Sequence, residues 1–308
     1  MRFRLIAAGL LAAALAAAGS GKAAVTVETV EYHGWPGAYR LSNGSVELVL
    51  VPQIGRIMRY GYAGERNVLW ENPAVAGKTV APEAETKEWV NFGGDKLWPA
   101  PQGRWGWPPD PVLDRGTLEV EPLSDGLRVT GRASEKSGIR YVREIRLAPR
   151  GSEVTLRNTM VNSGAAPVEW SVWEVTQVDS PDEACIPLHK SARYPQGFSI
   201  FQTSPPVPET IRVKADRACL TRHPEKGGKI ASDSPEGWTE AKVHGYRIRV
   251  SMQHEPGKEY PDEGRFLHLW SNPDPLPYME LEVLSPLQKL APGKRYTFTT
   301  HWSLRKEL

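Results

Sequence analysis

Residues 39–51 read YRLSNGSVELVLV, in which two short apolar-rich segments flank Asn43-Gly44. Asn-Gly is the dipeptide that best accepts positive φ at both central positions of a type I′ turn. The stretch therefore predicts a β-hairpin formed by residues 39–41 and 46–51.

Strand-like segments separated by turn residues recur along the chain. Two pairs, 118–122 with 127–133 and 140–147 with 153–161, predict further hairpins, and single strands are predicted at 168–178, 247–252, 266–270, 278–284 and 295–304. The 308 residues include 28 Gly and 27 Pro, too many breakers for a mostly helical chain. After the N-terminal segment, no window of about a dozen residues has apolar residues at helical spacing. The sequence predicts an all-β fold, and because no linker or repeat is evident, we expect one domain over residues 25–308.

Two segments, 70–112 and 179–245, are richer in Pro, Gly and charged residues than the rest of the chain. Both are too long to be hairpin loops. Long loops in a compact domain commonly form a binding site, so we expect these segments to contribute to one.

Residues 1–24 predict a secretory signal peptide. Arg2 and Arg4 precede an apolar run over residues 5–18, and small residues suitable for cleavage follow it. The run is short for a membrane span, although a single membrane anchor is the alternative. We expect the segment to be removed, which leaves a periplasmic or secreted chain without an integral membrane segment.

The charge balance argues against a nucleic-acid partner. The chain has 38 Lys and Arg against 36 Asp and Glu, and three of the basic residues lie in the predicted signal peptide. The mature chain is therefore close to neutral, and no run of Lys or Arg supplies the charge that phosphate binding needs. No pattern specifies an oligomeric state.

Cys185 and Cys219 are the two cysteines of the chain. In an oxidising compartment such a pair is expected to form one disulfide, with two buried free thiols as the alternative. No two histidines have the spacing of metal ligands, so no metal site is expected. Without a Gly-rich phosphate loop or a nucleophile elbow, we expect neither a bound cofactor nor serine or cysteine hydrolase chemistry.

Several short motifs together resemble the galactose mutarotase-like (aldose 1-epimerase-like) proteins. The motifs are Asn43-Gly44, VELVLVP at 46–52, IGRI at 54–57, NVLWENP at 67–73, YMELE at 278–282 and LAPG at 290–293. Within that superfamily, NFGGDKLWP at 91–99 and WEVTQ at 173–177 are similar to an uncharacterised bacterial branch, a domain of unknown function. The resemblance implies a single-domain antiparallel β-supersandwich whose concave face holds a carbohydrate.

A mutarotase needs a general base and a general acid on opposite sides of one pocket. The resemblance assigns these roles to a Glu on a late strand and a His on a central strand. On the late strand, alternation places Tyr278, Glu280 and Glu282 on one face. Glu280 is the candidate base, with a solvated outer face as the alternative, and Glu282 is expected to be solvated.

The central strand, residues 170–177, contains no His. Glu174 is the candidate acid, since burial would raise its pKa and a two-carboxylate site with Glu280 would result. Alternatively, Glu174 accepts hydrogen bonds from sugar hydroxyls, with Gln177 on the other face of the strand as a further ligand-binding residue.

The segment from Trp89 to Trp107 is the strongest functional signal. It contains four tryptophans, stiffening Gly and Pro residues, and the polar residues Asn91, Asp95, Lys96, Gln102 and Arg104. Indole faces can stack on a pyranose while polar side chains bind its hydroxyls, which makes Trp98, Trp105, Asn91, Asp95 and Lys96 candidate substrate-binding residues. A satellite core at one end of the sandwich is the alternative.

Two further residues join the candidate site. Arg56 is included by analogy with the opening motif, and His189 lies in a long loop region from which it could reach the concave face. The sequence favours an exported enzyme that acts on a carbohydrate at its anomeric centre. The alternatives are a non-catalytic carbohydrate-binding protein and an envelope protein whose aromatic residues bind another protein.

Overall fold

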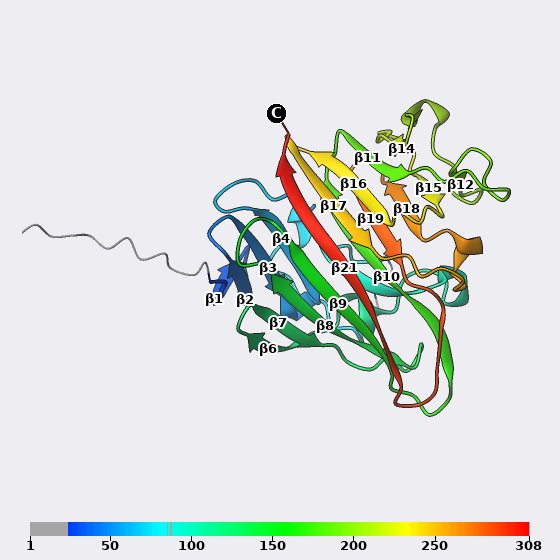
Figure 1. Ribbon diagram of the computed structural model, residues 1–308. Helices are drawn as coiled ribbons and strands as arrows, with labels where there is room; N and C mark the ends of the chain where they lie inside the picture. Colours follow the sequence, from blue (N-terminus) through cyan, green and yellow to red (C-terminus); the bar gives the residue numbers. More distant parts are fainter. Residues whose placement is uncertain (1–23, 85, 87, 308) are drawn as a thin grey trace, which may run out of the picture.

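The computed structural model describes residues 24–84, 86 and 88–307 (Figure 1). The predicted signal peptide, residues 1–24, lies outside this range except for its last residue. Among the described residues, no helix combines the length and the apolar character that crossing a bilayer requires.

Two large antiparallel sheets form the fold, as predicted (Figure 1). The eleven-stranded sheet carries the candidate site and is called the cavity sheet. Its strands, in spatial order, are β1 (Thr26–Tyr32), β2 (Trp35–Ser42), β3 (Val46–Val51), β4 (Arg56–Tyr62), β5 (Asp95–Ala100), β10 (Val168–Asp179), β19 (Tyr278–Leu284), β18 (Leu267–Ser271), β15 (Gly228–Ser232) and β12 (Ser199–Ile200), with β20 (Gln288–Leu290) paired to β10.

The second sheet has ten strands and is called the backing sheet. Its strands, in order, are β13 (Ile211–Val213), β14 (Arg217–Leu220), β11 (Glu183–Pro187), β16 (Trp238–Val243), β17 (Tyr246–Met252), β21 (Arg295–Lys306), β9 (Val154–Asn162), β8 (Ile139–Leu147), β7 (Gly126–Thr130) and β6 (Glu119–Leu123). The described helices are short: α1 (Pro111–Arg115) and the 3-10 turns Pro52–Ile54, Pro73–Val75, Gln102–Arg104, Pro208–Thr210 and Asp262–Gly264.

The predicted opening hairpin forms between β2 and β3, but its turn is not type I′. Gly44 has a positive φ of 81°, whereas Asn43 does not have positive φ. The Asn43 side chain explains the difference, because its Oδ1 accepts hydrogen bonds from the backbone N–H groups of Ser45 and Val46. An Asx turn therefore replaces the expected pair of left-handed residues.

The predicted strands at residues 118–133, 140–161, 168–178 and 247–304 are confirmed by the strands β6–β10 and β17–β21. Segment 179–245 was expected to be loop, and most of it is, but six short strands, β11 to β16, interrupt it and make up 25 of its 67 residues. Alternation did not reveal these strands, since several have only two to five residues.

The core lies between the two sheets. Most β10 residues and all β19 residues are buried, because one face of each strand packs on the backing sheet and the other faces the cavity or the residues around it. On β19, Met279, Leu281 and Val283 belong to the hydrophobic core. The alternate residues are thus directed to the opposite face, where Glu280 and Glu282 line a cavity.

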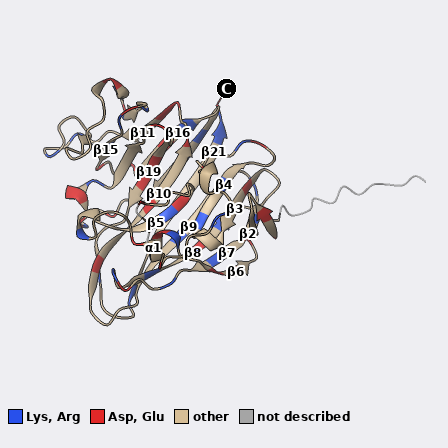
Figure 2. Cartoon of the chain, turned by 180° about the vertical axis from the view of Figure 1, so that it is seen from behind, with Lys and Arg blue, Asp and Glu red and all other residues tan. Residues whose placement is uncertain are grey.

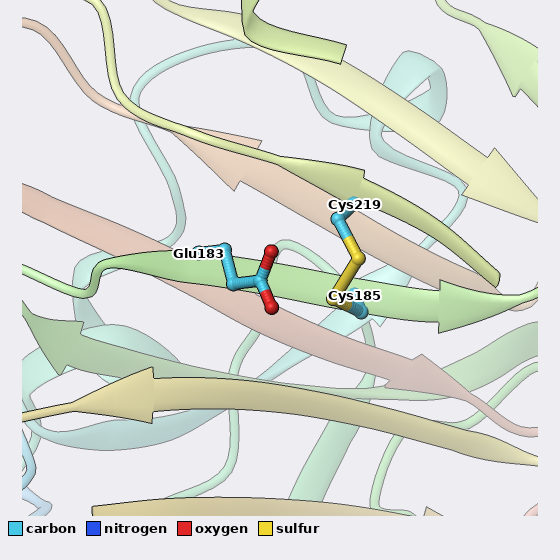
Figure 3. A group of neighbouring side chains, drawn as sticks. All are labelled: Glu183, Cys185 and Cys219. Atoms are coloured by element: carbon cyan, nitrogen blue, oxygen red, sulfur yellow. A yellow bond between two sulfur atoms is a disulfide. The ribbon is translucent and has the colours of Figure 1, made fainter. Parts of the chain in front are cut away.

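The predicted disulfide between Cys185 and Cys219 is present (Figure 3). The two residues are opposite one another on β11 and β14, so strand register brings them together. Glu183 lies close to both sulfur atoms, the one such group of potential metal ligands among the described residues. Because the sulfurs are bonded to each other and the Glu183 carboxylate accepts hydrogen bonds from Lys214, the group is not a set of free ligands.

Candidate functional site

A cavity of about 820 Å³ lies against the central strands of the cavity sheet. Its volume is in the range of small-molecule sites. Aromatic rings form much of its wall, namely those of Trp89, Trp98, Trp107, Trp173, Trp270, Phe201 and Tyr278. Figure 2 shows acidic segments on β19 and a basic segment on β5. The charged residues that line the cavity are Glu280 and Glu282 of β19, Lys229 of β15 and Asp262.

The segment leading into β5 is held by two glycines. Gly93 and Gly94 have φ values of 96° and 66°, and a Cβ at either position would collide with the backbone oxygen of Trp70 or Ile57. Only glycine adopts this conformation at such a close approach. The following strand then places Lys96 and Trp98 on its cavity face, with Asp95 and Leu97 on the opposite face.

Asp114 of α1 fixes two of the tryptophans. Trp98 Nε1 donates to Asp114 Oδ1 at 2.8 Å, and Trp89 Nε1 donates to Asp114 Oδ2 at 2.9 Å. Arg56 Nη2 also donates to Asp114 Oδ1, at 2.8 Å, and its side chain is fully buried. Arg56 therefore does not line the cavity as predicted, but supports the tryptophans through Asp114.

Most tryptophans of the segment 89–107 line the cavity and one packs outside it. Both predicted roles, a sugar site and a satellite core, are therefore represented. Trp89, Trp98 and Trp107 line the cavity together with Asn91 and Gln102. Trp105 does not: its Nε1 donates to the backbone oxygen of Pro99 at 2.7 Å, and its ring packs edge-on against Trp98.

Glu280 lines the cavity and is 7% exposed. Gln177 Nε2 donates to Glu280 Oε1 at 2.9 Å, and Lys96 Nζ lies 3.4 Å from the same oxygen. Burial raises the pKa of Glu280, a change that Lys96 opposes and Glu282 reinforces. Burial lowers the pKa of Lys96 to about 8, although Glu280 acts in the other direction. The predicted residues Glu280, Lys96 and Gln177 are thus brought together.

Glu282 is also part of the cavity wall, which corrects the expectation that it is solvated. It is fully buried, and its Oε2 accepts hydrogen bonds from Trp173 Nε1 at 2.8 Å and Lys229 Nζ at 2.7 Å. His268 Nδ1 lies 3.4 Å from the same oxygen. Burial alone would raise the pKa of Glu282, but Lys229 and His268 together lower it to about 2.

Glu174 faces away from the cavity, into the core between the sheets. Its carboxylate accepts hydrogen bonds from Asn158, Thr300 and Trp302 at 2.6 to 2.8 Å. Burial and the nearby Asp95 raise the pKa of Glu174 to about 7. The predicted two-carboxylate site of Glu174 and Glu280 does not form, because the two side chains lie on opposite sides of the cavity sheet.

Asp95 belongs to the same inter-sheet cluster as Glu174. It is fully buried, pairs with Arg143 at 2.7 Å and accepts a hydrogen bond from Thr176 at 3.0 Å. It is therefore not among the residues that line the cavity. The prediction placed Asp95 at the site as a polar residue of the tryptophan-rich segment, but adjacent strand residues point to opposite faces, so Asp95 and Lys96 cannot both face the cavity.

Of two more residues predicted at the site, one lines the cavity and the other does not. Asn91 lines the cavity, and its Nδ2 has no hydrogen-bond partner. His189 is outside the cavity wall, where its Nδ1 lies 3.1 Å from Asp233 Oδ1.

Sequence reasoning missed several cavity residues, among them Lys229, Asp262, Trp270 and Phe201. Phe201 and Lys229 come from the segment interpreted as loop. Trp270 shares a strand with His268, which the alternation places on the same face. This shared face was the one sequence pattern that could have indicated Trp270 as a site residue.

A family model described as Domain of unknown function (DUF4380) matches residues 38–305. The chain belongs to this family. The DUF4380 chain is similar in structure to a galactose mutarotase related enzyme from Lactobacillus acidophilus, with a TM-score of 0.58, 10% identity, and coverage of 87% of this chain and 97% of that one.

A galactose mutarotase-like protein from Lactobacillus casei matches with a TM-score of 0.58 and 11% identity, over 87% of the DUF4380 chain and 100% of the other. One from Clostridium acetobutylicum has a TM-score of 0.55 and 9% identity, over 92% and 99% of the two chains. The predicted galactose mutarotase-like β-sandwich is thereby confirmed. No curated protein matches the sequence.

Proposed function

We propose that this DUF4380 protein binds a carbohydrate in the tryptophan-lined cavity and that Glu280 exchanges a proton with the sugar's anomeric hydroxyl. The observation that carries the proposal is the position of Glu280: a buried carboxylate with a raised pKa, directed into a cavity walled by indole rings. Indole faces suit the apolar faces of a sugar ring, and a raised pKa suits a group that must both accept and release a proton. The fold shared with galactose mutarotase-like proteins supports the same proposal.

The reaction needs two proton transfers. Glu280 takes the proton of the anomeric hydroxyl while a second group protonates the ring oxygen; the bond from the anomeric carbon to the ring oxygen breaks and an open-chain aldehyde forms. Reversal after rotation of the aldehyde closes the ring in the other anomeric form. Lys229 is the proposed second group, because it is the cation among the described cavity-lining residues.

A specific observation favours a second candidate, non-catalytic carbohydrate binding. Trp173 occupies the cavity face of the central strand β10, where the resemblance implies a catalytic His. His268 is fully buried behind Glu282, so the described residues hold no exposed imidazole across from Glu280. A protein of this kind would bind the sugar without interconverting its anomers.

NMR of the protein with freshly dissolved α-anomers of glucose and galactose distinguishes the two candidates. Faster anomer exchange with the wild-type protein, lost in Glu280→Gln and kept in the exposed control Glu225→Gln, would support the enzyme. Broadened sugar signals with an unchanged exchange rate would support binding alone. If no mono- or oligosaccharide in a broader panel broadened, the carbohydrate proposal would be wrong.

We also propose that the protein is exported to the periplasm or secreted. The disulfide between Cys185 and Cys219 supports an oxidising compartment. Fractionation of cells that express the full chain, with N-terminal sequencing of the product, tests the proposal. A product that stays in the cytoplasm with its N-terminus intact would contradict it.

A further inference from the structure

The cavity floor is wide compared with one sugar ring. Strands β5, β10, β19, β18 and β15 are consecutive in the cavity sheet, and the first and last carry Trp98 and Lys229. Neighbouring strands lie about 4.8 Å apart, so the backbones of the first and last of these strands are roughly 19 Å apart. Their side chains reach inward over the floor: the Trp173 ring centroid lies 5.3 Å from that of Trp98 and 4.8 Å from Lys229 Nζ. A single pyranose ring fills only part of the cavity volume of about 820 Å³.

The aromatic rings are close neighbours that do not share one plane: the ring centroid of Trp98 lies 6.3 Å from that of Trp107 and 5.3 Å from that of Trp173. Trp98 meets Trp107 at an interplanar angle of 86° and Trp173 at 78°. Phe201 lies at the other side, where the Lys229 ammonium is 5.3 Å from its ring centroid. Rings that stand nearly perpendicular cannot all stack on one pyranose, so they fit several sugar units in succession.

The charges of the wall are unfavourable for an acidic ligand. Glu280, Glu282 and Asp262 line the cavity, and Lys229, the cation of the described wall, is already bonded to Glu282 at 2.7 Å. A ligand carboxylate would therefore face three carboxylates and one cation that is already paired, and like charges brought together weaken binding.

The unpaired polar atoms around the cavity suit hydroxyl groups. Asn91 Nδ2 is a donor without a partner, and Gln177 Oε1 and Glu282 Oε1 are acceptors without one. Buried polar atoms normally have hydrogen-bond partners. A sugar hydroxyl both donates and accepts, so it can satisfy either kind, whereas a carboxylate can only accept.

We infer that the cavity takes a neutral oligosaccharide of at least two sugar units, and that the segment around Trp107 and the segment around Phe201 contact different units. This inference rests on the proposed carbohydrate-binding function and specifies its ligand class.

Calorimetry with matched series tests the inference on the full mature chain. The neutral probes are glucose with maltose and maltotriose, glucose with cellobiose and cellotriose, and galactose with galactobiose and galactotriose; the acidic probes are galacturonic, digalacturonic and trigalacturonic acid. Within a series that binds, affinity should rise about tenfold or more from monosaccharide to trisaccharide, because the added units bind without a second association step. The acidic trisaccharide should bind about tenfold or more weakly than that neutral trisaccharide.

The outcomes separate this inference from the proposed function. A monosaccharide that binds as tightly as its trisaccharide, or an acidic oligosaccharide that binds more tightly than every neutral one, would overturn the inference and leave carbohydrate binding intact. If none of the probes bound, the proposed function and the inference would both be overturned.

Two rim variants supply an independent measurement. Trp107→Ala and Phe201→Ala remove side chains that are not in the buried core, so both proteins should fold. Each should lower the affinity for the best trisaccharide about tenfold, while at most one of them lowers the affinity for the corresponding monosaccharide. Equal losses for the monosaccharide in both variants, or no loss for the trisaccharide in either, would overturn the assignment of separate units.

Discussion

Glu280 and Glu282 lie two residues apart on one face of β19, and their pKa values are shifted in opposite directions. The pKa of Glu280 is raised because burial outweighs the 3.4 Å contact with Lys96. The pKa of Glu282 is lowered to about 2 because Lys229 and His268 outweigh burial. Two neighbouring carboxylates thus differ in role: Glu280 takes up a proton at higher pH than an ordinary Glu, while Glu282 remains an anion that positions Lys229.

Replacement of Lys96 by Met should raise the pKa of Glu280 further, because Lys96 is the main group that lowers it. The expected result is a shift of the acidic limb of the pH–rate profile for anomer exchange to higher pH, by about one unit or more. The ¹³C chemical shift of the Glu280 carboxyl group measures the same change if the protein only binds its sugar. The exposed control Lys289→Met should leave both unchanged, and an unshifted Glu280 titration in Lys96→Met would contradict the assignment.

Replacement of Asp114 by Asn should disturb the tryptophans without changing any cavity-lining side chain. Asp114 accepts from Trp89, Trp98 and Arg56, and the variant leaves the buried Arg56 charge unpaired. We expect a loss of about 3–5 kcal/mol in the free energy of unfolding. Near-UV circular dichroism and sugar affinity should change as well.

The double variant Arg56→Met/Asp114→Asn separates the two effects of Asp114. It removes the unpaired cation, so much of the stability should return while the altered indole signal and the weaker sugar binding remain. Full recovery of affinity in the double variant would show that Asp114 does not position the tryptophans.

Glu174 should make the protein less stable as the pH rises from about 4.5 to about 7. Its pKa is raised from 4.5 to about 7 on folding, so the folded state holds the proton more tightly than the unfolded state. The stabilisation is therefore complete below pH 4.5 and is lost as the pH increases through the folded pKa, with a total on the order of 3 kcal/mol. Urea unfolding of the wild type and Glu174→Gln over this range measures it, and equal slopes in the two proteins would contradict the shift.

Removal of the disulfide by Cys185→Ala/Cys219→Ala should lower the free energy of unfolding by about 3–4 kcal/mol, since the bond closes a loop of 34 residues in the unfolded chain. The measurement is denaturant unfolding with and without a reducing agent, which should affect only the wild type. Sugar affinity should be preserved, because neither cysteine lines the cavity.

The sequence was sufficient for the longer strands but not for the short strands β11 to β16, nor for which strands pair with each other. Turn residues and alternation identify β8, β9, β10 and β19 directly. The pairing of β10 with β19 is different, because Gln177 and Glu280 are 103 positions apart and local sequence contains no information about which distant strand becomes the partner. The resemblance predicted a late and a central strand at one pocket, but not that these two strands pair.

For the site, alternation predicted which residues share a face of a strand, but not whether that face is solvated, buried or part of a cavity. It placed Glu280 and Glu282 together, yet whether that face is solvated depends on Trp173 and the loops that cover it. Glu174 was predicted at the site because it lies on the central strand, where the resemblance implies a catalytic His, whereas its carboxylate accepts hydrogen bonds from Asn158, Thr300 and Trp302 inside the core. These partners come from the backing sheet, which no local pattern connects to β10.

The attachment of Trp89 and Trp98 to Asp114 has an evolutionary consequence. Asp114 lies on a five-residue helix that belongs to neither sheet, and the segment between Trp98 and this helix carries Gln102 and Trp107 at the cavity rim. Insertions or deletions in that segment would reorient the indoles while every strand keeps its register. Ligand preference in this family can therefore change without any change in the pairing of the strands.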